Sequence, residues 1–104
     1  MPQFITVAKA ESFKSGDRIV VEIGERYIAV FMVGGNFYAI EDVCTHDDGP
    51  LAEGELNAAD LIVECPRHGA QFDLTTGRSL SLIAPRPVAT FPVRVENGDV
   101  QVEV

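Results

Sequence analysis

The two cysteines and two histidines of this chain fall into two short motifs of the kind that bind transition metals. One motif is Cys44-Thr45-His46 and the other is Cys65-Pro66-Arg67-His68, and residues 47–64 separate them. The chain contains no further cysteine or histidine. A thiolate and an imidazole placed close together, twice, make two halves of one four-ligand metal site. We therefore expect a metal centre held by Cys44, His46, Cys65 and His68.

Each motif combines one sulfur ligand with one nitrogen ligand, and this mixture narrows the choice of metal. Zinc fingers usually take cysteines from one segment and histidines from another. One thiolate and one imidazole per loop suit a two-iron cluster in which each loop gives a cysteine to one iron and a histidine to the other. Three alternatives stay open: structural zinc on the same four residues, a mononuclear iron with a carboxylate such as Asp73, and a Cys44–Cys65 disulfide. The last two would leave cysteines or histidines without a role.

The two motifs resemble the cluster-binding boxes, Cys-x-His and Cys-x-x-His, of Rieske [2Fe–2S] proteins. Residues 69–77, Gly-Ala-Gln-Phe-Asp-Leu-Thr-Thr-Gly, are similar to the continuation G-x-x-F-D-x-x-T-G that follows the second box in that family. Residues 84–87, Ala-Pro-Arg-Pro, resemble the proline-containing loop that shields the cluster. The resemblance runs over essentially the whole chain. It implies one Rieske-type [2Fe–2S] cluster per chain, ligated by the four residues of the two boxes.

The sequence around the boxes predicts an almost entirely β scaffold. Apolar runs and alternations predict strands over residues 4–8, 19–23, 27–33, 36–40, 61–63, 71–74, 88–96 and 100–104. Gly34-Gly35 and Asn97-Gly98 predict two-residue hairpins, and Gly24-Glu25 predicts a tight turn. The continuous apolar run 27–33 should be a central strand. Helical signals are nearly absent, so residues 8–13 and 57–59 should form short turns at most.

Many short strands at close spacing predict an all-β domain, an antiparallel β-sandwich or barrel. At 104 residues the chain should be a single domain, residues 1–104. Both boxes fall in loops, so two loops at one tip of the scaffold can hold the cluster. The Rieske resemblance implies that the cluster-binding part, about residues 41–85, is a small subdomain inserted into the larger β domain. It also implies that His46 and His68 lie at the exposed tip and the two cysteines deeper.

Several other side chains should have structural roles. Asp73 and Thr76 should close a turn through side-chain hydrogen bonds, with Gly77 at positive φ. Phe72 should pack beneath the cluster. The remaining prominent aromatic residues should belong to the core: Tyr27, Phe31, Phe37, Tyr38 and Phe91.

The residues near the second box also bear on the reduction potential. Two imidazoles in place of two thiolates remove roughly two negative charges, which places Rieske potentials at about −150 to +300 mV against about −400 mV for plant-type ferredoxins. The high-potential respiratory members of the family aim a serine and a tyrosine hydroxyl at sulfur, and the corresponding positions here are Ala70 and Phe72. Neither side chain can donate a hydrogen bond. The disulfide of those members has no counterpart at the matching positions, Gly49 and Arg67. We therefore expect a potential near the bottom of the window, with loop backbone amides as the main donors.

Composition excludes several classes of partner. The formal net charge of −8 opposes binding to nucleic acid, because phosphate repels an acidic protein. The acidic residues Asp47, Asp48, Glu53 and Glu55 could instead steer the chain toward a basic protein surface. No apolar run is long enough to cross a bilayer, and the first residues do not form a secretion signal. Low cysteine usage fits the cytoplasm.

The sequence predicts an electron carrier and not an enzyme, because it has no dinucleotide fingerprint and no nucleophile–histidine pair. The resemblance implies a soluble ferredoxin of a ring-hydroxylating dioxygenase system for aromatic compounds. Such a protein passes electrons from an NAD(P)H-dependent flavoprotein reductase to a terminal oxygenase. Two alternatives stay open: a Rieske ferredoxin of another pathway, related to nitrite reductase or iron–sulfur assembly, and a zinc-stabilised interaction module without redox chemistry.

Overall fold

The computed structural model describes residues 3–24, 26–42, 54–65, 69–80 and 87–104. In these ranges the chain is almost entirely β. The elements, in chain order, are β1 (Phe4–Lys9), η1 (Ala10–Ser12), β2 (Arg18–Ile23), β3 (Arg26–Val33), β4 (Asn36–Glu41), β5 (Glu55–Asn57), β6 (Ile62–Glu64), β7 (Gln71–Asp73), β8 (Thr90–Phe91), β9 (Val93–Glu96) and β10 (Asp99–Glu103). Within the same ranges, no helix is long and apolar enough to span a membrane.

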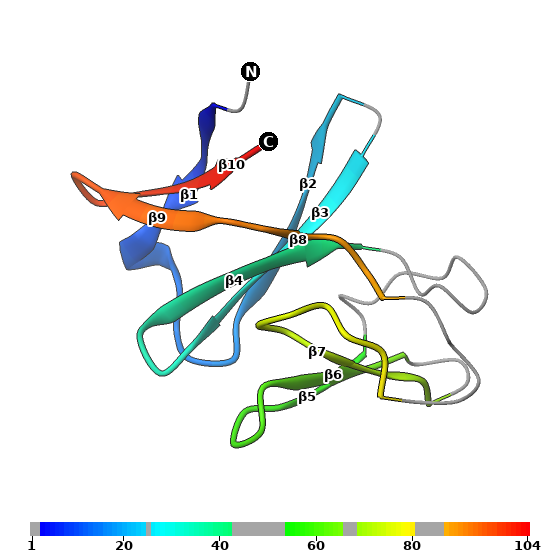
Figure 1. Cartoon of the computed structure of the whole chain (residues 1–104). Helices are drawn as coiled ribbons and strands as arrows, with labels where there is room; N and C mark the ends of the chain where they lie inside the picture. The colour runs from blue at the N-terminus through cyan, green and yellow to red at the C-terminus, as the bar shows by residue number, and fades with distance from the viewer. Residues whose placement is uncertain (1–2, 25, 43–53, 66–68, 81–86) are drawn as a thin grey trace.

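The strands form three antiparallel sheets, which Figure 1 shows in sequence from one end of the molecule to the other. The terminal sheet has the order β1-β10-β9, the middle sheet β2-β3-β4-β8, and the inserted sheet β5-β6-β7. The two ends of the chain meet in the terminal sheet, where the Gln3 amide donates to the Val104 carbonyl over 3.2 Å. The predicted all-β antiparallel architecture is thereby confirmed.

The strand β3 is buried on both of its faces over residues 28–31, which explains its continuous apolar run. Ile28 and Val30 face the terminal sheet, whereas Ala29 and Phe31 face the inserted sheet. Side chains of a strand alternate between its two faces, so a strand between two packed layers is apolar at every position. The prediction that residues 27–33 form a central strand is confirmed.

Two separate apolar cores result from this layering. The terminal core, between the terminal and middle sheets, has these buried members: Phe13, Ile28, Val30, Ala39, Val100 and Val102. The inserted core, between the middle and inserted sheets, has these: Ala29, Phe31, Ile40, Val63, Cys65, Ala70, Phe72, Leu74 and Val88.

The inserted sheet interrupts the middle sheet in sequence but not in space. The last strand of the middle sheet pairs with β4 through Ala39 opposite Phe91 and Ile40 opposite Thr90. The whole inserted sheet lies in the stretch of chain between these two neighbouring strands. The strands β4 and β8 therefore pair directly although β5, β6 and β7 lie between them in sequence, as the predicted inserted subdomain requires.

Two details of the predicted strands are wrong. Residues 88–96 do not form one strand, because the chain leaves the middle sheet after β8 and joins the terminal sheet at β9. Pro92 stands at the change and has no N–H to continue the ladder, while its carbonyl accepts from the Glu103 amide over 2.9 Å. The strand β5 was not predicted at all.

The aromatic residues predicted to be core differ in burial. Phe31 is fully buried, and Phe37, Tyr38 and Phe91 are partly buried against the two cores. Tyr27 is instead 56 % exposed. It is the second residue of β3 and pairs with Glu22 of β2. The predicted core role of Tyr27 is therefore wrong.

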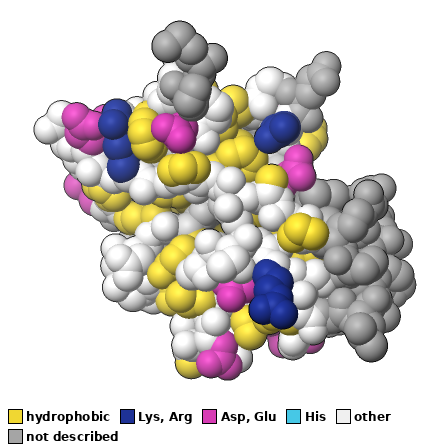
Figure 2. All heavy atoms as spheres, viewed as in Figure 1, with side chains coloured by type: hydrophobic (Ala, Val, Ile, Leu, Met, Phe, Trp, Pro, Cys, Tyr) yellow, Lys and Arg dark blue, Asp and Glu magenta, His cyan; other side chains and the backbone are white. Residues whose placement is uncertain are grey.

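The outer surface carries ordinary mixed charge. Figure 2 shows acidic and basic side chains beside several groups of apolar side chains on the face in view. Ion pairs join Lys9 to Asp99 at 2.6 Å and Arg94 to Glu96 at 3.1 Å, both on the terminal sheet. Such exposed pairs contribute about 0–1 kcal/mol each, so they do not decide the fold.

Candidate metal centre

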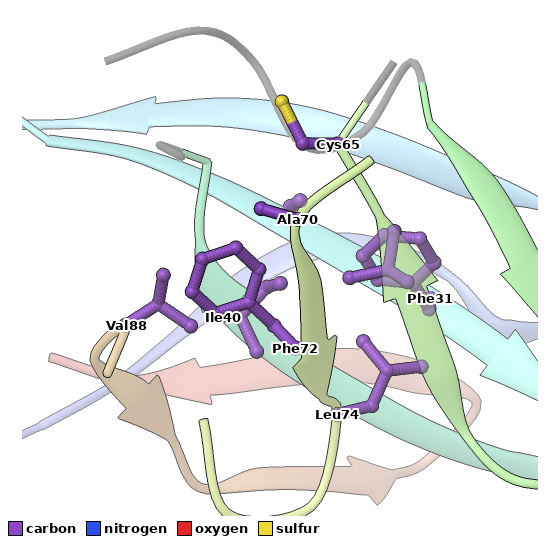
Figure 3. Packing of buried hydrophobic residues seen from close by; sticks show 9 residues of the cluster. Phe31, Ile40, Cys65, Ala70, Phe72, Leu74 and Val88 are labelled. Carbon is purple, nitrogen blue, oxygen red and sulfur yellow. The ribbon is translucent and has the colours of Figure 1, made fainter. Parts of the chain in front are cut away.

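Cys65 directly follows β6 and is buried in the inserted core, between the inserted and middle sheets. Its side chain is only 1 % exposed and is a free thiol, which argues against the disulfide interpretation. In Figure 3 its sulfur points away from the apolar side chains of the inserted core. The strand β6 alternates Ile62 and Glu64 outward with Val63 inward, and this alternation sets the direction in which the next residue enters.

The residues around the second box form a closed loop. The Cys65 amide donates to the Ala70 carbonyl over 2.6 Å, and the Gly69 amide donates to the Cys65 carbonyl over 3.0 Å. Gly69 has φ of +75°, a conformation that other residues rarely adopt. These two bonds hold Cys65 close to Gly69 and Ala70. The Gly69 amide is used to close the loop.

The floor under Cys65 is apolar. Ala70 and Phe72 are both fully buried, with 0 % of their surface exposed to solvent. Figure 3 shows Ala70 directly below Cys65 and Phe72 deeper, near Ile40 and Val88. Neither Ala70 nor Phe72 carries a side-chain donor. Among the described residues, the floor beneath the sulfur is therefore apolar, and neither Ala70 nor Phe72 offers it a hydroxyl.

The turn after β7 is built by one aspartate. Asp73 Oδ1 accepts from the Thr75 hydroxyl at 2.6 Å, the Thr75 amide at 2.8 Å and the Thr76 amide at 3.4 Å. The Thr75 hydroxyl is the main reason that the pKa of Asp73 is lowered from its ordinary value of 3.8. Thr76 Oγ1 accepts from the Arg78 amide at 3.2 Å. The predicted side-chain-closed turn is confirmed.

Gly77 ends this turn in very close contact with the chain that follows the proline-containing segment. Its φ is +75°, as predicted, and a Cβ at this position would lie 2.1 Å from the Val88 carbonyl oxygen. The Val88 amide donates to the Gly77 carbonyl over 2.9 Å. Only a glycine allows this approach, which holds Val88 against the end of the Asp73 turn.

A carboxylate stands beside the second box. Glu64 directly precedes Cys65, and a Cβ on Gly69 would lie 3.8 Å from Glu64 Oε1. The Gln71 amide group donates to the same oxygen over 3.4 Å. Glu55 is the cross-strand partner of Glu64, so two acidic residues stand opposite one another on the outer face of the inserted sheet. This part of the molecule is locally negative.

Sequence reasoning missed one contact at the base of the inserted sheet. The guanidinium of Arg18, at the start of β2, donates from Nη1 to the Gly54 carbonyl over 2.6 Å. It also lies over the ring of Phe31, 5.2 Å from the centroid. No sequence pattern predicts the hydrogen bond from Arg18 to Gly54, because its acceptor is a backbone carbonyl.

Of the four predicted ligands, the described residues include Cys65. Cys44, His46 and His68 lie outside the described residues, as do the proline-containing segment from 81 to 86 and the acidic residues 47, 48 and 53. Within the described ranges, no group of three or more histidine, cysteine or acidic side chains could hold a metal. A buried free thiol above an apolar floor, at the mouth of a loop closed by its own backbone, nevertheless fits a sulfur ligand of an iron–sulfur cluster.

Comparison with known families decides the class. The profile of the Rieske [2Fe–2S] domain matches residues 3–92. This chain belongs to the Rieske [2Fe–2S] family. Its cofactor is accordingly a Rieske-type [2Fe–2S] cluster, and the zinc and mononuclear-iron interpretations of the two boxes are set aside.

Similar Rieske proteins are known in sequence and in structure. The ferredoxin subunit of 3-phenylpropionate/cinnamic acid dioxygenase from Shigella flexneri serotype 5b is 49% identical over 77 residues, which cover 74% of this chain and 72% of that protein. The ferredoxin of carbazole 1,9a-dioxygenase from Nocardioides aromaticivorans IC177 superposes with a TM-score of 0.90 at 29% identity, over 95% of both chains. A chain in the complex of reduced oxygenase and oxidized ferredoxin in carbazole 1,9a-dioxygenase matches with a TM-score of 0.88 at 37% identity, over 95% of this chain and 91% of that one.

Proposed function

We propose that this protein is the ferredoxin of a ring-hydroxylating dioxygenase system. It takes single electrons from an NAD(P)H-dependent flavoprotein reductase and passes them to a terminal oxygenase. The observation that carries the proposal is the 49% identity to the ferredoxin subunit of 3-phenylpropionate/cinnamic acid dioxygenase. The structural likeness to a chain of an oxygenase–ferredoxin complex supports the oxygenase as partner. The protein is then a carrier in the cytoplasm, where its reductant is formed, and has no catalytic residue of its own.

We assign the cluster ligands to Cys44, His46, Cys65 and His68. The assignment is supported by the burial of the Cys65 thiol and by the loop that its backbone closes with Gly69 and Ala70. It places the cluster-binding part within about residues 41–85, around the inserted sheet. When bound, the cluster accepts and releases one electron. The residues of the chain hold it, exclude water from the cysteine side, and set the charge around it.

The same residues support a low reduction potential. Ala70 and Phe72 offer no hydroxyl to the buried sulfur, so the side-chain hydrogen bonds that raise the potential in respiratory members are missing at both positions. Glu64 adds a negative charge beside Gly69 and so disfavours the uptake of an electron. We therefore place the midpoint potential in the lower part of the Rieske window, below 0 mV.

Electron delivery tests the proposed function. NADH, the purified reductase and terminal oxygenase of a 3-phenylpropionate dioxygenase system, and this protein are combined, and oxygenated product is measured against NADH consumed. Product should form only when this protein is present, and the Cys65→Ala variant should not replace it. Reduction by the reductase without any product would limit the proposal to the electron-accepting half. A cluster-loaded protein that the reductase does not reduce would contradict the proposal.

The contribution of Glu64 to the potential has its own test. Replacing Glu64 with Gln should raise the midpoint potential by on the order of 20 mV, because one unit charge at about 10 Å in a water-rich environment is worth that much. Replacing Glu96 with Gln, on the terminal sheet, is the matched control and should leave the potential unchanged. Equal shifts in both variants would show that only net charge matters.

A further inference from the structure

We propose that Arg18 is the positioning residue that fixes the root of both cluster-binding loops. It lies in the middle sheet, outside both cysteine–histidine boxes and outside the predicted cluster-binding part. The inference deepens the proposed function, since it rests on the ligand assignment to the two boxes.

Arg18 joins the middle sheet to the inserted sheet. Its side chain is half-buried and crosses from β2 to the start of β5, where Nη1 donates to the carbonyl of buried Gly54 over 2.6 Å. A second nitrogen, Nη2, approaches the Gly16 carbonyl at 3.5 Å. A charged donor strengthens such a bond relative to a neutral pair. The guanidinium thus holds the inserted sheet to the middle sheet at one defined carbonyl.

The guanidinium of Arg18 is itself held in place. Arg18 and Phe31 are cross-strand partners, and the guanidinium carbon lies 5.2 Å from the centroid of the Phe31 ring. Phe31 is fully buried in the inserted core together with Cys65. A planar guanidinium can stack on a ring and donate from its edge at the same time, which a lysine ammonium cannot do. An arginine is therefore suited to hold the two sheets in a fixed arrangement.

The strand register relates the Gly54 carbonyl, to which Arg18 donates, to the second box. Glu55 pairs with Glu64 in the antiparallel register of β5 and β6, and continuing that register by one residue sets Gly54 opposite Cys65. Gly54 also directly precedes β5, the first described strand after the box that contains Cys44 and His46. A single hydrogen bond to Gly54 therefore acts on the end of the first box segment and on the strand beside the second box.

The other end of the first box segment is held in a different way. The Glu41 amide donates to the Ala89 carbonyl over 2.9 Å, and the Asp42 amide donates to the Tyr27 carbonyl over 2.8 Å. Those bonds belong to the backbone and survive any side-chain replacement. At the Gly54 end, the side chain of Arg18 supplies an anchor, and one substitution removes it.

Two variants of Arg18 test the proposal in the cluster-loaded protein. Arg18→Met keeps an apolar stem but removes the charged fork, and Arg18→Lys keeps the charge but loses the fork and the stacking. Three quantities are measured in each: the rate of iron loss to an excess of a ferrous chelator under reducing conditions, the g values of the reduced cluster, and the thermal unfolding midpoint. Arg26→Met is the matched control, because the Arg26 guanidinium also lies over a ring, that of Phe91 at 5.8 Å, but both residues belong to the middle sheet.

Arg18→Met should lose iron about tenfold faster than the wild type and should show shifted g values, since loss of an outer contact typically costs a metal site that much or more. Arg18→Lys should fall between the wild type and Arg18→Met. Arg26→Met should match the wild type in iron loss and g values, even where its unfolding midpoint falls.

Two outcomes would overturn the positioning role. One is an Arg18→Met protein with wild-type g values and wild-type iron loss. The other is iron loss that follows the fall in unfolding midpoint equally in Arg18→Met and Arg26→Met, which would make Arg18 a stabilising residue only. If Arg18→Met does not fold, the same comparison is made between Arg18→Lys and Arg26→Lys. None of these readouts uses a reductase or an oxygenase, so failure of the proposed electron delivery is seen separately.

Discussion

The terminal core is closed by β1, β9 and β10, strands of four to six residues, whereas the inserted core is closed by β5, β6 and β7, which have three residues each. Short strands supply few ladder hydrogen bonds. The inserted sheet therefore relies on particular contacts: the Cys65–Ala70 loop, the Asp73 turn, the Gly77–Val88 approach and the Arg18–Gly54 bond.

The two cores also differ in chemistry. The terminal core contains apolar side chains alone, while the inserted core includes the thiol of Cys65. One end of the molecule is thus an ordinary β scaffold, and the other is organised around a ligand. This difference predicts that the two ends respond differently to the loss of the cluster and to the same kind of mutation.

Removing a ligand should separate the two regions most strongly. Cys65→Ala should abolish cluster binding, because an alanine offers no sulfur to iron. The terminal core contains no proposed ligand, so the backbone amides of β1 and β10 should stay protected from hydrogen exchange while those of β6 and β7 lose protection. Iron analysis and hydrogen-exchange mass spectrometry measure both effects. Retention of two irons per chain in Cys65→Ala would disprove its assignment, and Val95→Ala, at an exposed site, is the control.

Cavities in the two cores should have different consequences for the cluster. Phe72→Ala should lower the free energy of unfolding by about 3–5 kcal/mol and should also speed iron loss, because Phe72 supports the floor below Cys65. Val102→Ala, in the terminal core, should cost about 1–3 kcal/mol and leave iron loss unchanged. Denaturant unfolding and chelator kinetics on both variants make the comparison. Equal acceleration of iron loss would mean that the cores behave as one unit.

Two glycines at nearly equal φ sharpen the comparison further. Gly77 has φ of +75° and would place a Cβ 2.1 Å from the Val88 oxygen, whereas Gly98 has φ of +80° and open space around its Cβ position. Gly98→Ala should lower the free energy of unfolding by about 1 kcal/mol, which is the cost of placing an alanine in the left-handed conformation. Gly77→Ala should cost at least about 2 kcal/mol, because the backbone near Val88 must also move. Similar losses in chemical unfolding would show that the close approach at Gly77 relaxes without cost.

The smallest expected effect is a pH dependence at the Asp73 turn. The Thr75 hydroxyl stabilises the ionised carboxylate, so the pKa of Asp73 is below the ordinary 3.8 in the folded protein. A lowered pKa gives stability that is present above the unfolded pKa and is lost as the pH falls through the folded value. The Asp73→Asn variant should therefore be less stable at neutral pH and should lose less stability than the wild type below about pH 4. If the free energies of unfolding of the two proteins change equally with pH across that range, this role of Asp73 is ruled out.

Sequence reasoning succeeded where the signal was local. The Asp73 turn, the positive φ at Gly77 and the hairpin at Asn97-Gly98 each depend on residues a few positions apart. The double-sided burial of β3 could also be read from an uninterrupted apolar run. In these cases neighbouring residues carry all the information that decides the conformation.

The features that sequence reasoning missed depend on the rest of the molecule. The Arg18–Gly54 bond joins residues 36 positions apart, and its acceptor is a backbone carbonyl that has no residue-type signature. The strand β5 has too few residues to show a period and exists because it pairs with β6. The change of sheet at Pro92 did carry a signal, because a proline inside a predicted strand should have divided it.

Anaerobic purification, followed by metal and acid-labile sulfide analysis and by electron spin resonance of the reduced protein, tests the central claim most directly. The account predicts a red-brown protein with two irons and two sulfides per chain, and a rhombic signal of low average g value that reports mixed histidine and cysteine ligation. A colourless protein that holds stoichiometric zinc would contradict it.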